Sequence, residues 1–171
     1  MTPKAKKIYA DGIHLLRAGN IPLYGRVIRE SFATVARDFK LTRMNCPKHP
    51  SFVADDHLLA KFDGRYTPFG MFQGGELVGF VSLSDKGGGV FMLNNLAVLP
   101  AHRHRGHGKK LLDFCKAAVK KTGGSKITID IIEENTALKN WYAANGFIHT
   151  GTRKYPGKPF TVGDMEWEVL K

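Results

Sequence analysis

One stretch in the middle of the chain constrains the fold most. An apolar run from Phe91 to Leu99 stops at Pro100 and leads into a basic, glycine-containing turn, and the residues from Gly106 to Lys121 then have helical apolar spacing. A strand, a glycine turn and a helix N-terminus form an anion site, because free N–H groups and the positive end of the helix dipole face the turn. Between residues 101 and 110 the chain has no acid and four cations, Arg103, Arg105, Lys109 and Lys110. The stretch predicts a site for a phosphorylated ligand.

Two common phosphate motifs do not fit this stretch. A Walker A loop requires glycine where Arg103 stands and serine or threonine where Lys110 stands. A dinucleotide-binding fingerprint requires a third glycine near position 111, which is Leu111. What remains is the pattern Arg103-x-x-Gly106-x-Gly108 directly after a strand.

This remaining pattern resembles the acyl-CoA pyrophosphate loop of the GNAT superfamily of N-acetyltransferases, usually written R/Q-x-x-G-x-G/A. A second GNAT signature, N-x-x-A-x-x-x-Y-x-x-x-G-F, resembles residues 135–147, with matches at Asn135, Tyr142, Gly146 and Phe147. The two signatures stand in the family's order. The resemblance implies an acetyltransferase that uses acetyl-CoA as acyl donor and a primary amine as acceptor.

The fold implied by the resemblance is a mixed α/β fold. It has a central, mostly antiparallel sheet with one splayed parallel strand pair, flanked by helices, in a single domain over residues 1–171. The expected strands are Ile8–Arg17, Thr67–Gln73, Glu76–Asp85, Val90–Leu99, Lys126–Ile132, Phe147–Arg153 and Phe160–Leu170, with Gly74-Gly75 as a hairpin turn. The expected helices are Pro22–Phe39, a short one capped by Ser51 with Leu58, Leu59 and Phe62 inward, Gly106–Lys121, and one from Asn135 to Gly146.

The resemblance also implies the residues that would hold the coenzyme. The pantetheine arm would run along the splayed strand, where the N–H of Leu96 or Ala97 would stabilise an oxyanion. Asn135 would either contact this arm or cap its helix. The residues expected to line the arm are Asn95, Leu96, Ala97 and Val98, and those expected to bind the pyrophosphate are Arg103, His104, Arg105, Gly106, His107, Gly108 and Lys109.

Tyr142 matches the family tyrosine that donates a proton to the departing thiolate. A phenol with a pKa near 10 is a plausible donor at neutral pH. A core role is the alternative, because aromatic residues on amphipathic helices are mostly buried. Ala137, Trp141 and Ala144 already form a predicted inward stripe, with Lys139 at the surface.

The general base is the open question. Many family members carry glutamate where this chain has Asn94, and an amide does not accept a proton usefully. Neutralising a lysine-like ammonium at pH 7 costs roughly 4–5 kcal/mol. Three solutions remain: a water chain oriented by Asn94 or Asn95, a carboxylate such as Glu133 or Glu134, or a less basic acceptor. The two glutamates are expected to be solvated surface residues.

Composition limits the classes of function and the cellular locations that remain. The net charge of +11 raises nucleic-acid binding as an alternative, but the sequence has no nucleic-acid motif, and the densest cationic cluster coincides with the phosphate loop. We expect no membrane span, no signal peptide and a cytoplasmic protein. Cys46 and Cys115 suit a reducing compartment, with Cys115 in the core. A coenzyme-binding protein without turnover and a homodimer both remain open.

Histidines cluster in the predicted loop at His102, His104 and His107. No cysteine or carboxylate joins them, and helix-spaced pairs are absent. We therefore expect no metal site. When protonated, these residues would add positive charge toward a phosphate.

Overall fold

The structure is a computed structural model that describes residues 9–170. Ile8 and the N-terminal segment on which the signal-peptide expectation rests lie outside the described residues. The elements are β1 (Gly12–Leu15), α1 (Ile21–Asp38), α2 (Asp55–Leu59), β2 (Tyr66–Gln73), β3 (Glu76–Gly87), β4 (Val90–Val98), α3 (His107–Lys121), β5 (Lys126–Ile132), α4 (Thr136–Ala144), β6 (Ile148–Arg153) and β7 (Val162–Glu168). This order confirms the predicted mixed α/β class.

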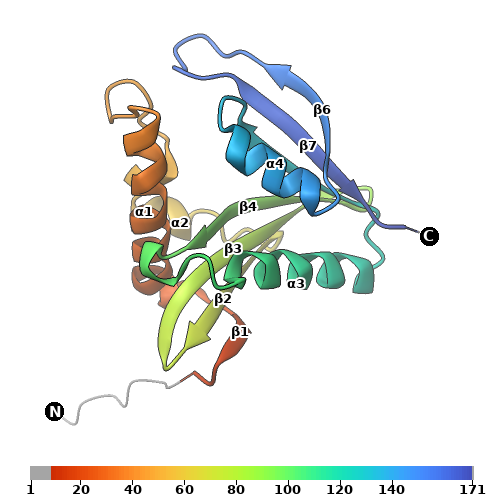
Figure 1. Cartoon of the computed structure of the whole chain (residues 1–171). Helices are drawn as coiled ribbons and strands as arrows, with labels where there is room; N and C mark the ends of the chain where they lie inside the picture. The colour runs from red at the N-terminus through yellow and green to blue at the C-terminus, as the bar shows by residue number, and fades with distance from the viewer. Residues whose placement is uncertain (1–8, 171) are drawn as a thin grey trace, which may run out of the picture.

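Seven strands form one sheet in the order β1-β2-β3-β4-β5-β7-β6. Every neighbouring pair is antiparallel except β4 and β5, which run parallel. Figure 1 shows the sheet as two arms, β1–β4 and β5–β7, that diverge from their junction, with α1 near the open end and α4 between the arms. The predicted splayed pair is therefore the place where the two arms of the sheet separate.

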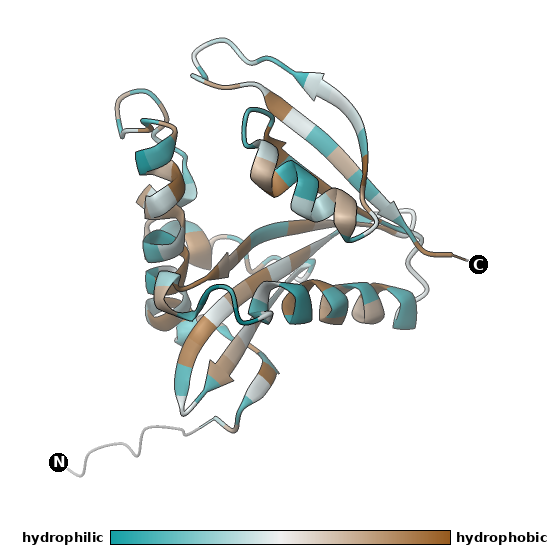
Figure 2. Cartoon of the chain, in the orientation of Figure 1, coloured by the Kyte–Doolittle hydropathy of each residue, from teal (hydrophilic) through white to brown (hydrophobic). Residues whose placement is uncertain are grey.

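Apolar side chains fill both faces of the first arm. One core lies under α3, where Leu111, Leu112 and Val119 are buried together with Cys115, the residue predicted to lie in the core. The other lies under α1 and α2 and contains Val27, Ile28 and Leu58. Figure 2 shows the hydrophobic colour concentrated on β3 and β4, whereas the loop before α3 is hydrophilic. The core under α3 continues onto the second arm, where it includes Ile127, Ile129 and Met165.

Local turn chemistry explains the predictions that are confirmed. Gly74 and Gly75 both have positive φ, 59° and 77°, as a two-residue hairpin between β2 and β3 requires. The Asn135 side chain accepts a hydrogen bond from the Leu138 N–H at 3.2 Å and caps α4. Burial raises the pKa of the Cys115 thiol to about 12, which agrees with its predicted place in the core.

Two details of the helices differ from the predictions. Ser51 caps no α-helix, because it lies in a short 3-10 turn at Pro50–Phe52, and α2 begins only at Asp55. Only Leu58 of the expected inward face is fully buried, whereas Leu59 is 51% exposed, since a five-residue helix has room for a single inward turn. Lys116 on α3 is half-buried and donates to the Asn145 carbonyl.

Candidate active site

The two parallel strands pair only at their beginnings. Val90, Phe91 and Met92 on β4 are in register with Lys126, Ile127 and Thr128 on β5. Within the described residues no further register joins these strands, although both continue for several residues. Their facing backbone groups therefore border a gap instead of a neighbouring strand (Figure 1).

A bulge on β4 contributes to this divergence. Phe80 pairs with Ala97, but the next β3 partner, Ser82, pairs with Asn94, so Asn95 and Leu96 have no partner on β3. Asn95 adopts a φ of +53°, and a bulge of this kind bends the strand. Of the two expected oxyanion donors, Ala97 lies in the β3–β4 ladder, and Leu96 lies outside it.

A cavity of about 790 Å³ occupies the gap. Its walls come from α1, β4, the loop before α3, β5, α4 and the segment between β6 and β7. Phe160 of that last segment packs against a small core of Ala36, Leu41 and Cys46 and so closes the far side. The volume lies within the range of small-molecule and cofactor sites.

The loop at one end of the cavity has the geometry of an anion site. His104 and Gly106 have positive φ, 61° and 78°, and α3 begins directly afterwards at His107. Successive N–H groups in such a turn, followed by a helix N-terminus, converge on a bound anion. Arg105, Lys109 and Lys110 are exposed around it.

Arg103 has a different role from the other loop cations. Its Nε donates to the Val98 carbonyl at 3.1 Å, and its two terminal nitrogens donate to Thr34 Oγ1 at 3.1 Å and the Ser31 carbonyl at 2.8 Å. The guanidinium therefore ties the loop to α1. The Arg103 backbone N–H donates to the Pro100 carbonyl at 3.3 Å, so the amides that can face a phosphate follow Arg103 in the loop.

His107 is an unusual residue at the start of α3. It is only 8% exposed, it lines the cavity, and neither ring nitrogen has a hydrogen-bond partner in the part of the chain that the structure describes. Burial, with smaller effects of Lys110, His102 and Arg105, lowers its pKa, so the ring is neutral at pH 7. Buried nitrogens without partners at a helix N-terminus fit an oxygen-rich ligand such as a diphosphate. Residues 9–170 contain no group of three or more metal-ligating side chains.

The face that α4 buries differs from the predicted one. Ala137 and Ala144 are exposed, whereas Leu138 and Trp141 are half-buried and Tyr142 is only 5% exposed. Tyr142 packs edge-on against Trp141 and Phe147 and also lines the cavity. Burial raises the pKa of its phenol above the ordinary value of 10, which keeps the phenol protonated. Tyr142 is thus both a core residue and a cavity wall.

None of Asn94, Glu133 and Glu134 offers an unpaired carboxylate to the cavity. The Asn94 amide donates to Ser84 Oγ and to the Met92 carbonyl, both at 3.2 Å. Glu133, expected at the surface, is instead half-buried and pairs with Lys139 and with His149, the latter at 2.9 Å. Glu134 is exposed, as predicted, and accepts from the Thr161 N–H. Neither glutamate lines the cavity.

The acidic residue of the cavity is absent from the sequence predictions. Asp130 on β5 is the only acidic residue among the cavity-lining residues, all of which belong to the described part of the chain. The available signal is its position: it follows Ile127 and Ile129, which are both buried, at the alternate, polar position of the strand.

A GNAT family model, described as the Acetyltransferase (GNAT) family, matches residues 33–147. The chain belongs to the GNAT family of acetyltransferases. No curated protein sequence matches it. None of the described helices is both long and apolar enough to cross a membrane.

Solved structures share the GNAT fold. The chain is similar to the ribosomal-protein-S18-alanine N-acetyltransferase of Escherichia coli, with a TM-score of 0.77 at 17% identity over 95% of this chain and 96% of that one. It is also similar to the PaiA N-acetyltransferase of Thermoplasma acidophilum in complex with coenzyme A, with a TM-score of 0.73 at 20% identity over 94% and 100%. A third, YncA of Salmonella typhimurium with acetyl-CoA, has a TM-score of 0.72 at 17% identity over 95% and 96%.

Proposed function

We propose that this GNAT protein transfers an acetyl group from acetyl-CoA to a primary amine by direct attack of the amine on the thioester. The observation that carries the proposal is the splayed β4–β5 pair, which frames a cavity with an anion-binding loop at one end and a tyrosine on its wall. The solved neighbours with coenzyme A and acetyl-CoA support the same donor. The two free, buried cysteines support a cytoplasmic location.

Each part of the cavity has a task in this reaction. The N–H groups of residues 104–109 would hold the diphosphate, and β4 residues 95–98 would line the pantetheine arm. The Leu96 N–H, which lies outside the β3–β4 ladder, would donate to the carbonyl oxygen as negative charge develops on it. Asn135, which lines the cavity and also caps α4, would contact the same arm.

Tyr142 would protonate the departing thiolate. Burial keeps the phenol in its protonated form, which is the form that a proton donor requires. In Tyr142→Phe we expect kcat to fall about 100-fold with little change in the coenzyme Kd, because the ring packing is kept. A thiol-release assay and calorimetry measure the two quantities, and an equal loss in both would refute the donor role.

A second candidate function is coenzyme binding without turnover. It is favoured by Asn94, whose amide is held by Ser84 and Met92 and offers no base on β4. Thiol release from acetyl-CoA with alkyl amines, lysine peptides and peptide N-termini decides between the two. Coenzyme binding without any amine-dependent release would favour the second candidate.

A further inference from the structure

Asp130 lies at the position of β5 that corresponds to Asn94 on β4. The last register pair of the two parallel strands is Met92 with Thr128, and Asn94 and Asp130 each lie two residues further on. Alternate residues of a strand share a face, so both side chains belong to the same face of the sheet, opposite the buried Leu93 and Ile129. Asp130 therefore stands across the gap from the position where a base is missing.

Two further charged residues hold Asp130 in place. Asp164 on β7 is its register partner, and Arg153 on β6 reaches both carboxylates. Arg153 Nε lies 2.8 Å from Asp164 Oδ2, and one terminal nitrogen lies 3.0 Å from Asp130 Oδ1. Arg153 makes more of its contacts with Asp164 than with Asp130, and the two carboxyl groups also share a side-chain hydrogen bond. The site has two carboxylates and one cation.

The same arrangement shifts the pKa values of the two carboxyl groups in opposite directions. The Asp130 side chain is 44% exposed; its partial burial raises its pKa, Arg153 opposes this, and Asp164 adds to the increase. Hydrogen bonds from Arg153 lower the pKa of Asp164. A pair of acids whose environments separate their pKa values is typical of an acid–base site.

The other charged groups near Asp130 leave it as the single candidate in this half of the cavity. His49 and Lys158 line the same cavity. The His49 Nδ1 accepts from the Ser51 N–H, so the neutral ring carries its proton on Nε2 and cannot accept another there. Lys158 lies against the rings of Tyr155 and Phe160 and is a cation.

We infer that Asp130 is the proton acceptor of the reaction and that the acceptor substrate enters as an alkylammonium ion against this carboxylate. The inference rests on the proposed function and specifies its substrate class. Asp130 takes one proton from the ammonium and passes it to water. The free amine attacks the thioester carbon, the C–S bond breaks with its electron pair on sulfur, and the thiolate takes the Tyr142 proton. The second nitrogen proton, lost as the amide forms, restores Tyr142.

The first test compares variants that remove or keep a carboxylate in the thiol-release assay. The acceptors are an alkyl diamine, a lysine peptide and a peptide N-terminus. In Asp130→Asn we expect kcat at pH 7 to fall about 100-fold, with the coenzyme Kd unchanged. Asp130→Glu, which keeps a carboxylate, should recover most of the activity. Glu166→Gln is the control, because Glu166 on the neighbouring strand β7 is also a carboxylate with a cationic partner, Lys126, but does not line the cavity.

The second test separates proton removal from a structural role. The Asp130→Asn defect should shrink by about tenfold for each pH unit gained, because the free-amine fraction grows by that factor below the amine pKa. It should vanish with an aryl amine that is already neutral at pH 7. A purely structural role predicts the same defect at every pH and with both amines.

Each outcome bears on a separate claim. Thiol release by Asp130→Asn within threefold of the wild type, or an unchanged pH profile, would overturn the role of Asp130 and leave acetyl transfer intact. Coenzyme binding without release by the wild type for any acceptor would overturn both the proposed function and this inference.

Discussion

At the scale of single residues, Arg103 shows how one side chain fixes a binding loop. The family pattern identifies it as a coenzyme residue, but its guanidinium is directed at α1 and not into the anion site. Its three hydrogen bonds join β4, the loop and α1, so the backbone amides that would meet the diphosphate depend on a side chain that need not touch it.

In Arg103→Ala we therefore expect a loss in stability as well as in coenzyme affinity. Removing three partly buried, charge-assisted bonds should lower the free energy of unfolding by about 2 kcal/mol. Arg105→Ala is the control, because Arg105 is exposed in the same loop and should change affinity alone. Denaturant unfolding and coenzyme titration measure the two effects. A stability loss of the same size in both variants would contradict this account.

At the scale of elements, the turn into α3 depends on backbone conformation. Gly106 has a φ of +78°, and a Cβ there would meet nothing within 4 Å. Gly106→Ala should therefore cost about 1 kcal/mol through backbone strain alone and misalign the following amides. Gly108→Ala, with ordinary φ and only a normal contact to Trp141 at 3.7 Å, should keep its stability. Equal unfolding midpoints for the two variants would argue against strain at Gly106.

The junction of β5, α4 and β6 should be sensitive to acid. Hydrogen bonds from Lys139, and then from His149, lower the pKa of Glu133. A carboxyl with a lowered folded-state pKa stabilises the fold above its unfolded pKa, and this stabilisation is lost as pH falls through the folded pKa. Glu133→Gln should therefore lower Tm at pH 7, and the difference from the wild type should narrow below about pH 4.5. A Tm difference that is constant with pH would show that packing, not charge, is lost.

Elements with local sequence signals could be predicted from the sequence, and those that depend on tertiary packing could not. The Gly74-Gly75 hairpin and the strand Lys126–Ile132 carry local signals, and both predictions are confirmed. The buried face of α4 has no such local signal. The nine residues of this helix allow several inward faces, and packing against Phe147 selects the one with Tyr142. For Asp130 the alternation of the strand indicates a polar face, but its place opposite Asn94 cannot be predicted, because it depends on a register between strands separated by a helix.

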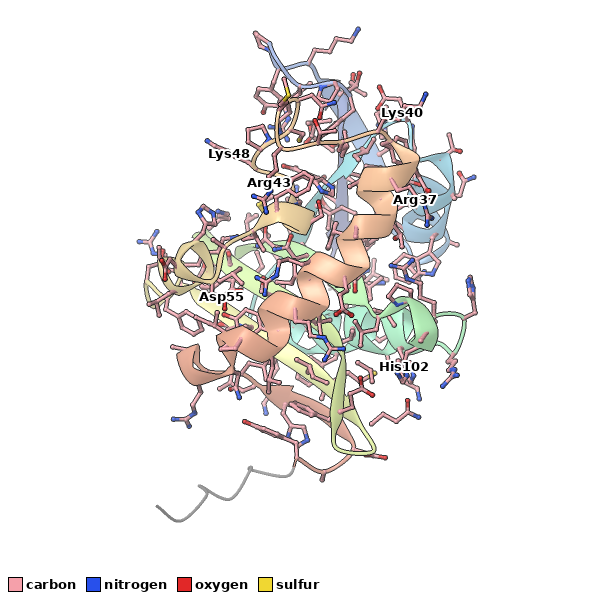
Figure 3. All side chains as sticks on the ribbon, turned by 90° about the vertical axis from the view of Figure 1, so that its left-hand side faces the viewer. Arg37, Lys40, Arg43, Lys48, Asp55 and His102 are labelled. Atoms are coloured by element: carbon pink, nitrogen blue, oxygen red, sulfur yellow. The ribbon has the colours of Figure 1, made fainter. Side chains whose placement is uncertain are left out.

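At the scale of the whole molecule, positive charge is clustered in two regions. One is the loop before α3. The other is the end of α1 and the segment after it, where Figure 3 shows the labelled Arg37, Lys40, Arg43 and Lys48 gathered, with Asp55 farther along. The sequence locates only the first region as a cluster, since the second forms when a helix end and a turn come together. Both lie on elements that also contribute walls to the cavity.

The central claim is that backbone amides of the loop before α3 hold a diphosphate and so direct a thioester into the gap between β4 and β5. Calorimetric titration with coenzyme A and with pantetheine, which lacks the diphosphate, tests it most directly. We expect coenzyme A to bind and pantetheine to bind at least about 100-fold more weakly, a difference of about 2.7 kcal/mol. Equal affinities, or no heat from coenzyme A with folded protein, would contradict the claim.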